Sequence, residues 1–168
     1  MGPKNRSTSR MRKDDGMTAL LTLDPAARRS VLALLGCMAG ADGDVSEEES
    51  EALAGAALAL GVTDGSILTV PTLDEIDFDS MDRQARLLAY AGAVWMMLAD
   101  GLTLRRESSL LSHLAERLRV GPDMARFLGS FARWVRTETE LPWHREADLL
   151  FTEAARRLAR VEAHQRAA

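Results

Sequence analysis

The sequence predicts an all-α protein that folds as a single domain of about six helices. Hydrophobic residues make up 46% of the chain but aromatic residues only 5%, and the apolar content is mostly Ala, Leu and Met, which favour helices. Apolar residues recur at helical spacing, and only the segment 66–70 resembles a strand. With 168 residues the chain is long enough for one substantial core.

A repeat with a period of 58 residues organises the chain. Residues 32–62 align without a gap on residues 90–120, so that Ala41-Asp42-Gly43 falls on Ala99-Asp100-Gly101. Each unit consists of an apolar helix, an Asp-Gly turn and an amphipathic helix. We therefore expect a domain built by duplication of this unit, with the two apolar helices buried at its centre.

Local signals place the helices of the first unit. Asp24 precedes a proline, which predicts a helix from about residue 25 to residue 40. Ser46 and Glu49 form an S-x-x-E capping box, which predicts a second helix that ends near Gly61.

The remaining elements follow from the repeat and from proline signals. The second unit predicts helices over about 81–99 and 104–119. A helix that carries Phe127, Phe131, Trp134 and Val135 is then expected, followed by a last helix that frays toward its end. The expected organisation is a basic, disordered tail at 1–23 and a helical domain at 24–168, which contains repeat units at 25–62 and 81–120, an acidic linker at 63–80 and C-terminal helices at 122–168.

Charge is distributed unevenly along the chain. Residues 1–13 carry five basic side chains, whereas residues 30–82, which we call the acidic half, carry twelve acidic residues and no Lys or Arg. Residues 83–168 hold fourteen Arg against ten acids. The acidic half is either a solvated face or a surface that binds a cation or a basic protein partner.

Several classes of function lack support in the sequence. Cys37 is the only cysteine and the three histidines are scattered, so a zinc site is not expected. No phosphate-binding loop or nucleophile motif occurs, and nucleic-acid binding is not expected. The longest apolar runs have 11 and 13 residues, well short of the roughly 20 of a membrane span. Without a signal peptide either, a cytoplasmic location is expected.

The first Asp-Gly turn resembles half of a calcium-binding loop. Placing Gly43 at the loop's central glycine puts Met38 and Gly40 where the first two ligands belong. Neither residue offers a side-chain oxygen, so an EF-hand is excluded.

A glutamate recurs in both units although capping explains only one copy. Leu104, which aligns with Ser46, cannot cap a helix, yet Glu107 is still present. If both turns lie at one end of the central helix pair, their carboxylates can share a divalent cation. The same carboxylates can instead accept turn amides, and a hydrolase that uses a carboxylate pair is a third alternative. The candidate metal ligands are Asp42, Asp44, Glu49, Asp100 and Glu107.

The two turns resemble the paired motif of the TerB-like family. The residues that carry the resemblance are 41–46 with Glu49, and 99–101 with Glu107, within a similar region of about 25–120. The resemblance implies a duplicated helical fold, a bacterial protein of tellurite or other stress resistance, and an acidic cluster that binds metal. We therefore expect a non-enzymatic protein that binds a cation or, alternatively, a metal-independent scaffold that docks a basic partner on its acidic half.

Overall fold

The computed structural model describes residues 23–41, 43–63, 65, 71–99 and 105–167, and this part of the chain is all-helical. The prediction of an all-α fold is therefore confirmed for this part of the chain. The strand-like segment 66–70 lies outside the described residues. The elements are α2 (Pro25–Ala39), α3 (Glu47–Leu60), the 3₁₀ turn η2 (Leu73–Glu75), α4 (Arg83–Met97), α5 (Arg105–Arg117), α6 (Pro122–Glu138) and α7 (Trp143–Ala167).

The first two helices begin at the residues that the sequence indicates. The Asp24 carboxylate accepts the N–H of Ala26 at 2.7 Å, with Pro25 in the first turn of α2. Ser46 and Glu49 form the predicted capping box, in which each residue's backbone N–H donates to the other's side chain, at 2.8 and 3.1 Å. These bonds satisfy donors that the first turn of a helix leaves unpaired.

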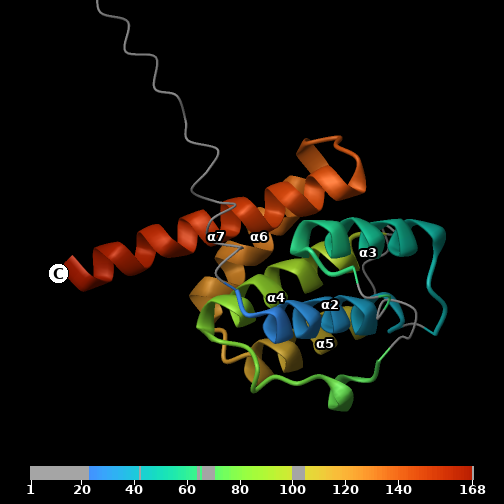
Figure 1. Ribbon diagram of the computed structural model, residues 1–168, viewed down its shortest axis with the longest axis horizontal. Coiled ribbons are helices and arrows are strands. Elements are labelled where there is room, and N and C mark those ends of the chain that lie inside the picture. The colour runs from blue at the N-terminus through green and yellow to red at the C-terminus, as the bar shows by residue number, and fades with distance from the viewer. Residues whose placement is uncertain (1–22, 42, 64, 66–70, 100–104, 168) are drawn as a thin grey trace, which may run out of the picture.

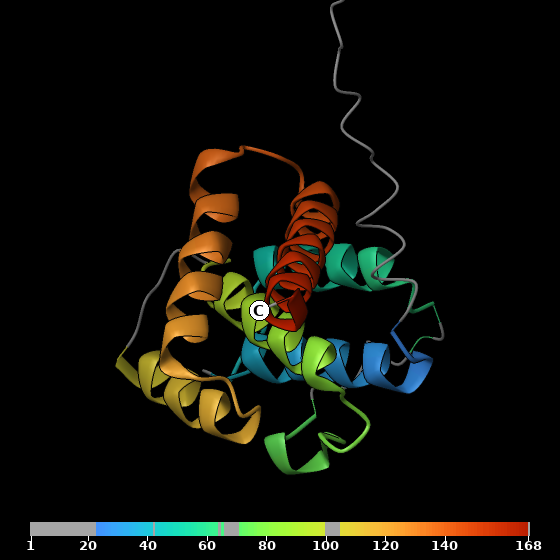
Figure 2. The ribbon, with the colours of Figure 1, turned by 90° about the vertical axis from the view of Figure 1, so that its left-hand side faces the viewer.

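Helix α4 is the centre of the molecule. It packs against α2 on one side and against α5 and α6 on the other, while α7 crosses over it (Figures 1 and 2). Twelve of its 15 residues are buried, as expected of a helix that is apolar nearly all round. Its buried side chains belong to one core cluster to which α2, α3, α6 and α7 also contribute.

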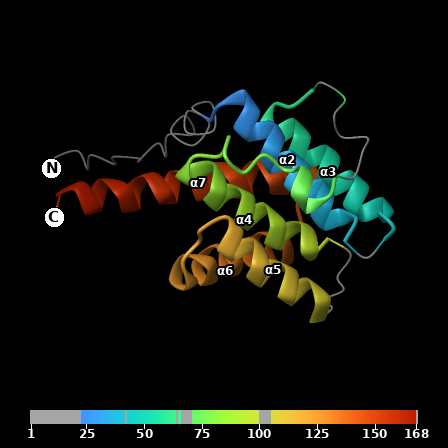
Figure 3. The ribbon, with the colours of Figure 1, turned by 90° about the horizontal axis from the view of Figure 1, so that it is seen from below.

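Helices α2 and α4 run side by side in the same direction (Figures 1 and 3). Near their N-termini the hydroxyls of Ser30 and Ser80 are hydrogen-bonded at 2.9 Å. Further along, Gly92 of α4 lies so close to Leu35 of α2 that an added Cβ would be 2.9 Å from the leucine's Cδ2. The C-terminal ends of the two helices therefore lie at the same end of the molecule.

Several hydrogen bonds recur 58 residues apart. The Arg28 Nε–H donates to the backbone carbonyl of Leu23 at 3.0 Å, and the Arg86 Nε–H donates to that of Met81 at 2.9 Å. Asp82 caps α4 as Asp24 caps α2. After α3 and α5, the N–H groups of the two aligned valines return to aligned alanines, Val62 to Ala57 at 2.9 Å and Val120 to Ala115 at 2.8 Å.

The C-terminal helices differ in detail from what the sequence pattern suggests. In α6, Phe131 and Val135 are buried, whereas Phe127 and Trp134 are exposed. The last two lie beside the inward stripe of the helix, and Trp134 stacks on Phe131 with ring centroids 6.0 Å apart. Helix α7 does not fray early: it continues to Ala167, and its last turns extend beyond the body of the protein (Figures 1 and 3).

Candidate functional site

The predicted acidic cluster falls only partly within the described residues. Asp42 and Asp100 lie outside them, and so does the side chain of Glu107, whose backbone belongs to α5. Asp44 is exposed, in the turn that precedes α3.

Glu49 is buried and serves as a cap. One of its carboxylate oxygens accepts the Ser46 N–H at 2.8 Å, in the capping box described above. Within the described residues no three His, Cys, Asp or Glu side chains are grouped closely enough to hold a metal ion. The two hydrogen bonds between Ser46 and Glu49 give Glu49 a structural role at the start of helix α3.

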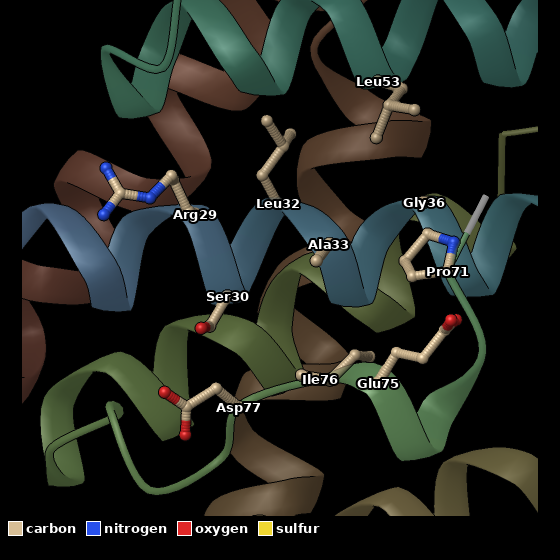
Figure 4. A pocket seen from close by; sticks show the side chains of 10 residues that line it. All are labelled: Arg29, Ser30, Leu32, Ala33, Gly36, Leu53, Pro71, Glu75, Ile76 and Asp77. Atoms are coloured by element: carbon tan, nitrogen blue, oxygen red, sulfur yellow. The ribbon is translucent and has the colours of Figure 1, made fainter. Parts of the chain in front are cut away.

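A hollow of about 240 Å³ lies over α2, between α3 and the segment 71–77 (Figure 4). We call it the acidic hollow. Figure 4 shows Leu32 and Leu53 directed into the space between α2 and α3, with Pro71 beside Gly36. A Cβ on Gly36 would lie 3.5 Å from Pro71 Cδ, which is ordinary van der Waals contact. The other lining residues are Arg29, Ser30, Ala33, Glu75, Ile76 and Asp77.

Two exposed carboxylates lie at the edge of the acidic hollow, and local hydrogen bonds fix both. Glu75 accepts the N–H of Thr72 at 2.6 Å and its hydroxyl at 2.9 Å. These bonds lower the pKa of Glu75, so it is ionised well below neutral pH. Asp77 accepts the N–H groups of Asp79 and Ser80 at 3.1 and 3.2 Å. The charges are thus held at defined positions beside an apolar surface.

One arginine from the second half of the chain reaches the acidic linker. Arg117 of α5 pairs with Asp74 at 3.1 Å and lies 4.7 Å from the centre of the Phe78 ring. Asp74 is almost fully exposed and Arg117 is about half exposed, so the pair contributes at most about 1 kcal/mol. It attaches the segment that bears Glu75 and Asp77 to α5.

A second polar group, which the sequence reasoning missed, is buried in the core. Glu146 of α7 has no exposed surface. Its carboxylate accepts the Trp95 Nε1–H at 2.9 Å and lies 3.3 Å from an Arg136 nitrogen. Burial raises the pKa of Glu146, and the bonds from Trp95 and Arg136 oppose that rise. The sequence does contain a sign of this burial, because Glu146 lies four residues before the buried Leu150 and therefore on the apolar face of α7.

Arg136 connects this group to the surface. Its guanidinium lies 4.2 Å from the centre of the Trp143 ring, which meets Trp95 edge to face at 5.7 Å between ring centroids. The residues come from α4, α6 and α7, so the group joins three helices. Because Glu146 is enclosed, we assign it to the architecture of the protein and not to a reaction with a substrate.

Arg119 has an unusual backbone conformation. Its φ is +56°, and the residue 58 positions earlier, Gly61, has φ +67° just after helix α3. A side chain in this left-handed region costs about 1–2 kcal/mol, which glycine avoids. Arginine thus occupies a position whose backbone conformation glycine would adopt at lower cost.

The remaining candidates are structural. Cys37 is half-buried, and burial raises its pKa, so its thiol is a poor nucleophile.

Among the described helices, none combines the length and apolarity needed to cross a membrane. Comparison with protein-family models, curated proteins and solved structures gives no match.

Proposed function

We propose that this protein is a non-enzymatic, TerB-like cytoplasmic domain of bacterial stress response, of the tellurite-resistance type, whose acidic half binds a basic protein partner. The observation that carries the proposal is the acidic hollow, which combines an apolar lining with two exposed carboxylates, Glu75 and Asp77, at its edge.

The chemistry of the hollow suits a basic amphipathic segment. An apolar side chain of the partner fits against Leu32 and Leu53, while lysine or arginine side chains pair with the two carboxylates. Complementary charge gives specificity and a fast association rate. Among the described residues, Arg29 is the one cation in the lining, and residues 30–82 contain no basic side chain that would repel such a partner.

The recurrent hydrogen bonds support the TerB-like part of the proposal. Arg28 and Arg86 make the same bond at positions 58 residues apart, and the aspartate caps Asp24 and Asp82 recur at the same interval. A duplicated helix–turn–helix unit accounts for this correspondence. The parallel direction of α2 and α4 agrees with it.

A double substitution tests the docking surface without disturbing the fold. Glu75→Gln with Asp77→Asn removes two charges but retains an oxygen that accepts each local hydrogen bond. The probe is a short labelled peptide with lysine on one helical face and leucine on the other, followed by fluorescence anisotropy. We expect affinity to fall about tenfold, which corresponds to 1.4 kcal/mol, and wild-type binding to weaken as salt increases.

The matched control is Glu138→Gln with Asp148→Asn, which changes net charge equally on α6 and α7, where both residues are exposed. It should leave peptide affinity unchanged at a given salt concentration. An equal loss in both double variants would mean that only net charge matters, and the acidic hollow would lose its role. A peptide of lysine without leucine should bind more weakly than the amphipathic one.

A divalent cation at the Asp-Gly turns is the second candidate function. The parallel direction of α2 and α4 favours this candidate. It places the C-terminal ends of both helices, which the two Asp-Gly motifs follow in the sequence, at the same end of the helix pair. Helix C-termini carry partial negative charge that attracts a cation. The proposed ligands remain Asp42, Asp44, Glu49, Asp100 and Glu107.

Titration of chelator-treated protein with Ca²⁺, Mg²⁺, Zn²⁺ and Mn²⁺ tests this candidate by calorimetry and amide NMR. Asp42→Asn and Asp100→Asn should each abolish saturable binding. Glu49→Gln is informative because glutamine also completes a capping box, so weaker binding with unchanged stability would identify Glu49 as a ligand. If no ion binds below millimolar concentration, the cation hypothesis is wrong, and the peptide experiment is unaffected.

A further inference from the structure

A hollow of about 430 Å³ beside the turn between α5 and α6 is lined by arginines and apolar side chains. We call it the arginine hollow. Its cations are Arg83 and Arg86 of α4 and Arg119 of the turn, and its apolar walls include Leu87, Leu118 and Met124. No carboxylate lines it within the described part of the chain. We propose that it binds a small organic anion with an apolar body, such as an alkyl carboxylate or an alkyl phosphate.

Arg86 is oriented before any ligand binds. Its Nε–H donates to the Met81 carbonyl at 2.9 Å and its Nη2 donates to the Phe78 carbonyl at 3.1 Å. These bonds use two of the five guanidinium donors. The side chain is therefore held in place by the segment that precedes α4, which lowers the entropy lost when an anion binds.

The backbone at Arg119 supports a binding role for its side chain. The residue adopts the left-handed conformation that Gly61 adopts in the first unit. Backbone strain of this kind is concentrated at functional sites. Arg119 also borders a second hollow, of about 620 Å³, on the Tyr90 side of the same turn, so the residue lies between two cavities.

The shape and chemistry of the arginine hollow indicate the class of ligand. Arginine forms paired hydrogen bonds with carboxylate and phosphate groups. Leu87, Leu118 and the half-buried Met124 line the hollow and give the body of the ligand an apolar environment. A volume of a few hundred cubic ångströms is typical of sites for small organic molecules. A bare inorganic anion would leave the apolar walls in contact with water.

The experiment uses octanoate and octyl phosphate as probes, with octanol as the neutral analogue and inorganic phosphate as the headgroup alone. Binding is measured by calorimetry and by amide NMR. We expect saturable binding of both amphiphilic anions, with octanol and inorganic phosphate weaker by about tenfold or more. Vesicles that contain anionic lipid form a separate arm, because a membrane surface presents the same headgroup chemistry.

Two substitutions at one position separate the roles of the side chain and the backbone. Arg119→Gln removes the charge and keeps the backbone strain, so it should weaken octanoate binding about tenfold. Arg119→Gly should weaken binding equally while raising the melting temperature by about 2–4 °C, because glycine fits the conformation. A merely structural arginine would change stability without changing affinity.

The control is Glu140→Gly. Glu140 has φ +45°, is exposed and lies beyond the far end of α6. The substitution Glu140→Gly should raise the melting temperature without changing the affinity for octanoate. The proposal is overturned if neither amphiphilic anion binds below millimolar concentration, if octanol binds as tightly as octanoate, if Arg119→Gln binds like the wild type, or if the protein binds anionic vesicles but no free anion.

Discussion

The indole N–H of Trp95 donates a 2.9 Å hydrogen bond to the carboxylate of Glu146, across 51 residues of sequence and between the two helices α4 and α7. Both side chains are completely buried. Because a buried polar group that loses its partner is costly, this bond fixes how α7 lies on the central helix, and Arg136 extends the constraint to α6.

Removing the Glu146 carboxylate should destabilise the protein strongly. Glu146→Leu leaves the Trp95 N–H and the Arg136 guanidinium without their acceptor, and we expect a loss of about 3 kcal/mol in the free energy of unfolding. Urea denaturation measures it. In a double-mutant cycle with Trp95→Phe, the coupling energy should be about 1–2 kcal/mol. Additive effects would show that the hydrogen bond contributes nothing of its own.

The stability contributed by Glu146 should depend on pH. Burial raises its folded pKa above the ordinary value of 4.5, so the folded chain holds this proton more tightly than the unfolded chain. The free energy of unfolding of the wild type, relative to Glu146→Gln, should be highest below pH 4.5 and fall as pH rises toward the folded pKa. Above that pKa the difference should be constant.

Urea titrations of both proteins at a series of pH values measure this difference, and the comparison cancels the other carboxylates. A difference that instead grows as pH rises toward 4.5 and is constant above it would mean that the folded pKa is lowered, with the Arg136 interaction outweighing burial.

Gly55 should be intolerant of even a methyl group. A Cβ there would lie 2.8 Å from the His144 nitrogen and 2.9 Å from the Trp143 carbonyl carbon, which are backbone atoms that cannot rotate away. We expect Gly55→Ala to cost about 1–3 kcal/mol despite its better helix propensity. In the control, Gly129→Ala of α6, nothing lies within 4 Å of the added Cβ, and stability should rise by up to about 1 kcal/mol. Thermal unfolding distinguishes the two.

Loss of the cap on α3 should have a moderate effect. Ser46→Ala removes the oxygen that accepts the Glu49 N–H at 3.1 Å, at a cost of about 1 kcal/mol in the free energy of unfolding. Ser50→Ala, at an exposed position one turn later, should change stability by less than half as much. Equal effects would show that the cap is not what stabilises the start of the helix.

The sequence predicted those parts of the fold that short-range chemistry determines. Asp24 and Ser46 mark helix starts because their side chains bond to the next few backbone groups, and such signals can be read from neighbouring residues. Glu146 could not be assigned in this way, since its environment depends on Trp95, 51 residues away. A glutamate in the first turn of a helix is ordinary at the surface, where it interacts favourably with the helix dipole.

A backbone conformation that is unusual for its residue type could not be predicted from the sequence either. Glycine signals a left-handed residue at position 61, but Arg119 gives no such signal although its φ is similar. Only the repeat relates the two positions. For the candidate metal ligands, the sequence identified the two Asp-Gly motifs. The parallel packing of α2 and α4 adds that the C-terminal ends of these two helices lie at one end of the molecule (Figure 3).

The burial of α4 has a consequence for how the two halves of the chain fold. The helix is covered by α2 from the first half and by α6 and α7 from the second, so neither half encloses its own apolar surface. Fragments separated within the linker 63–80 should therefore aggregate when expressed singly and recover a helical, cooperative fold when co-expressed. Such a result would show that the two halves are complementary parts of one folding unit and not tandem domains.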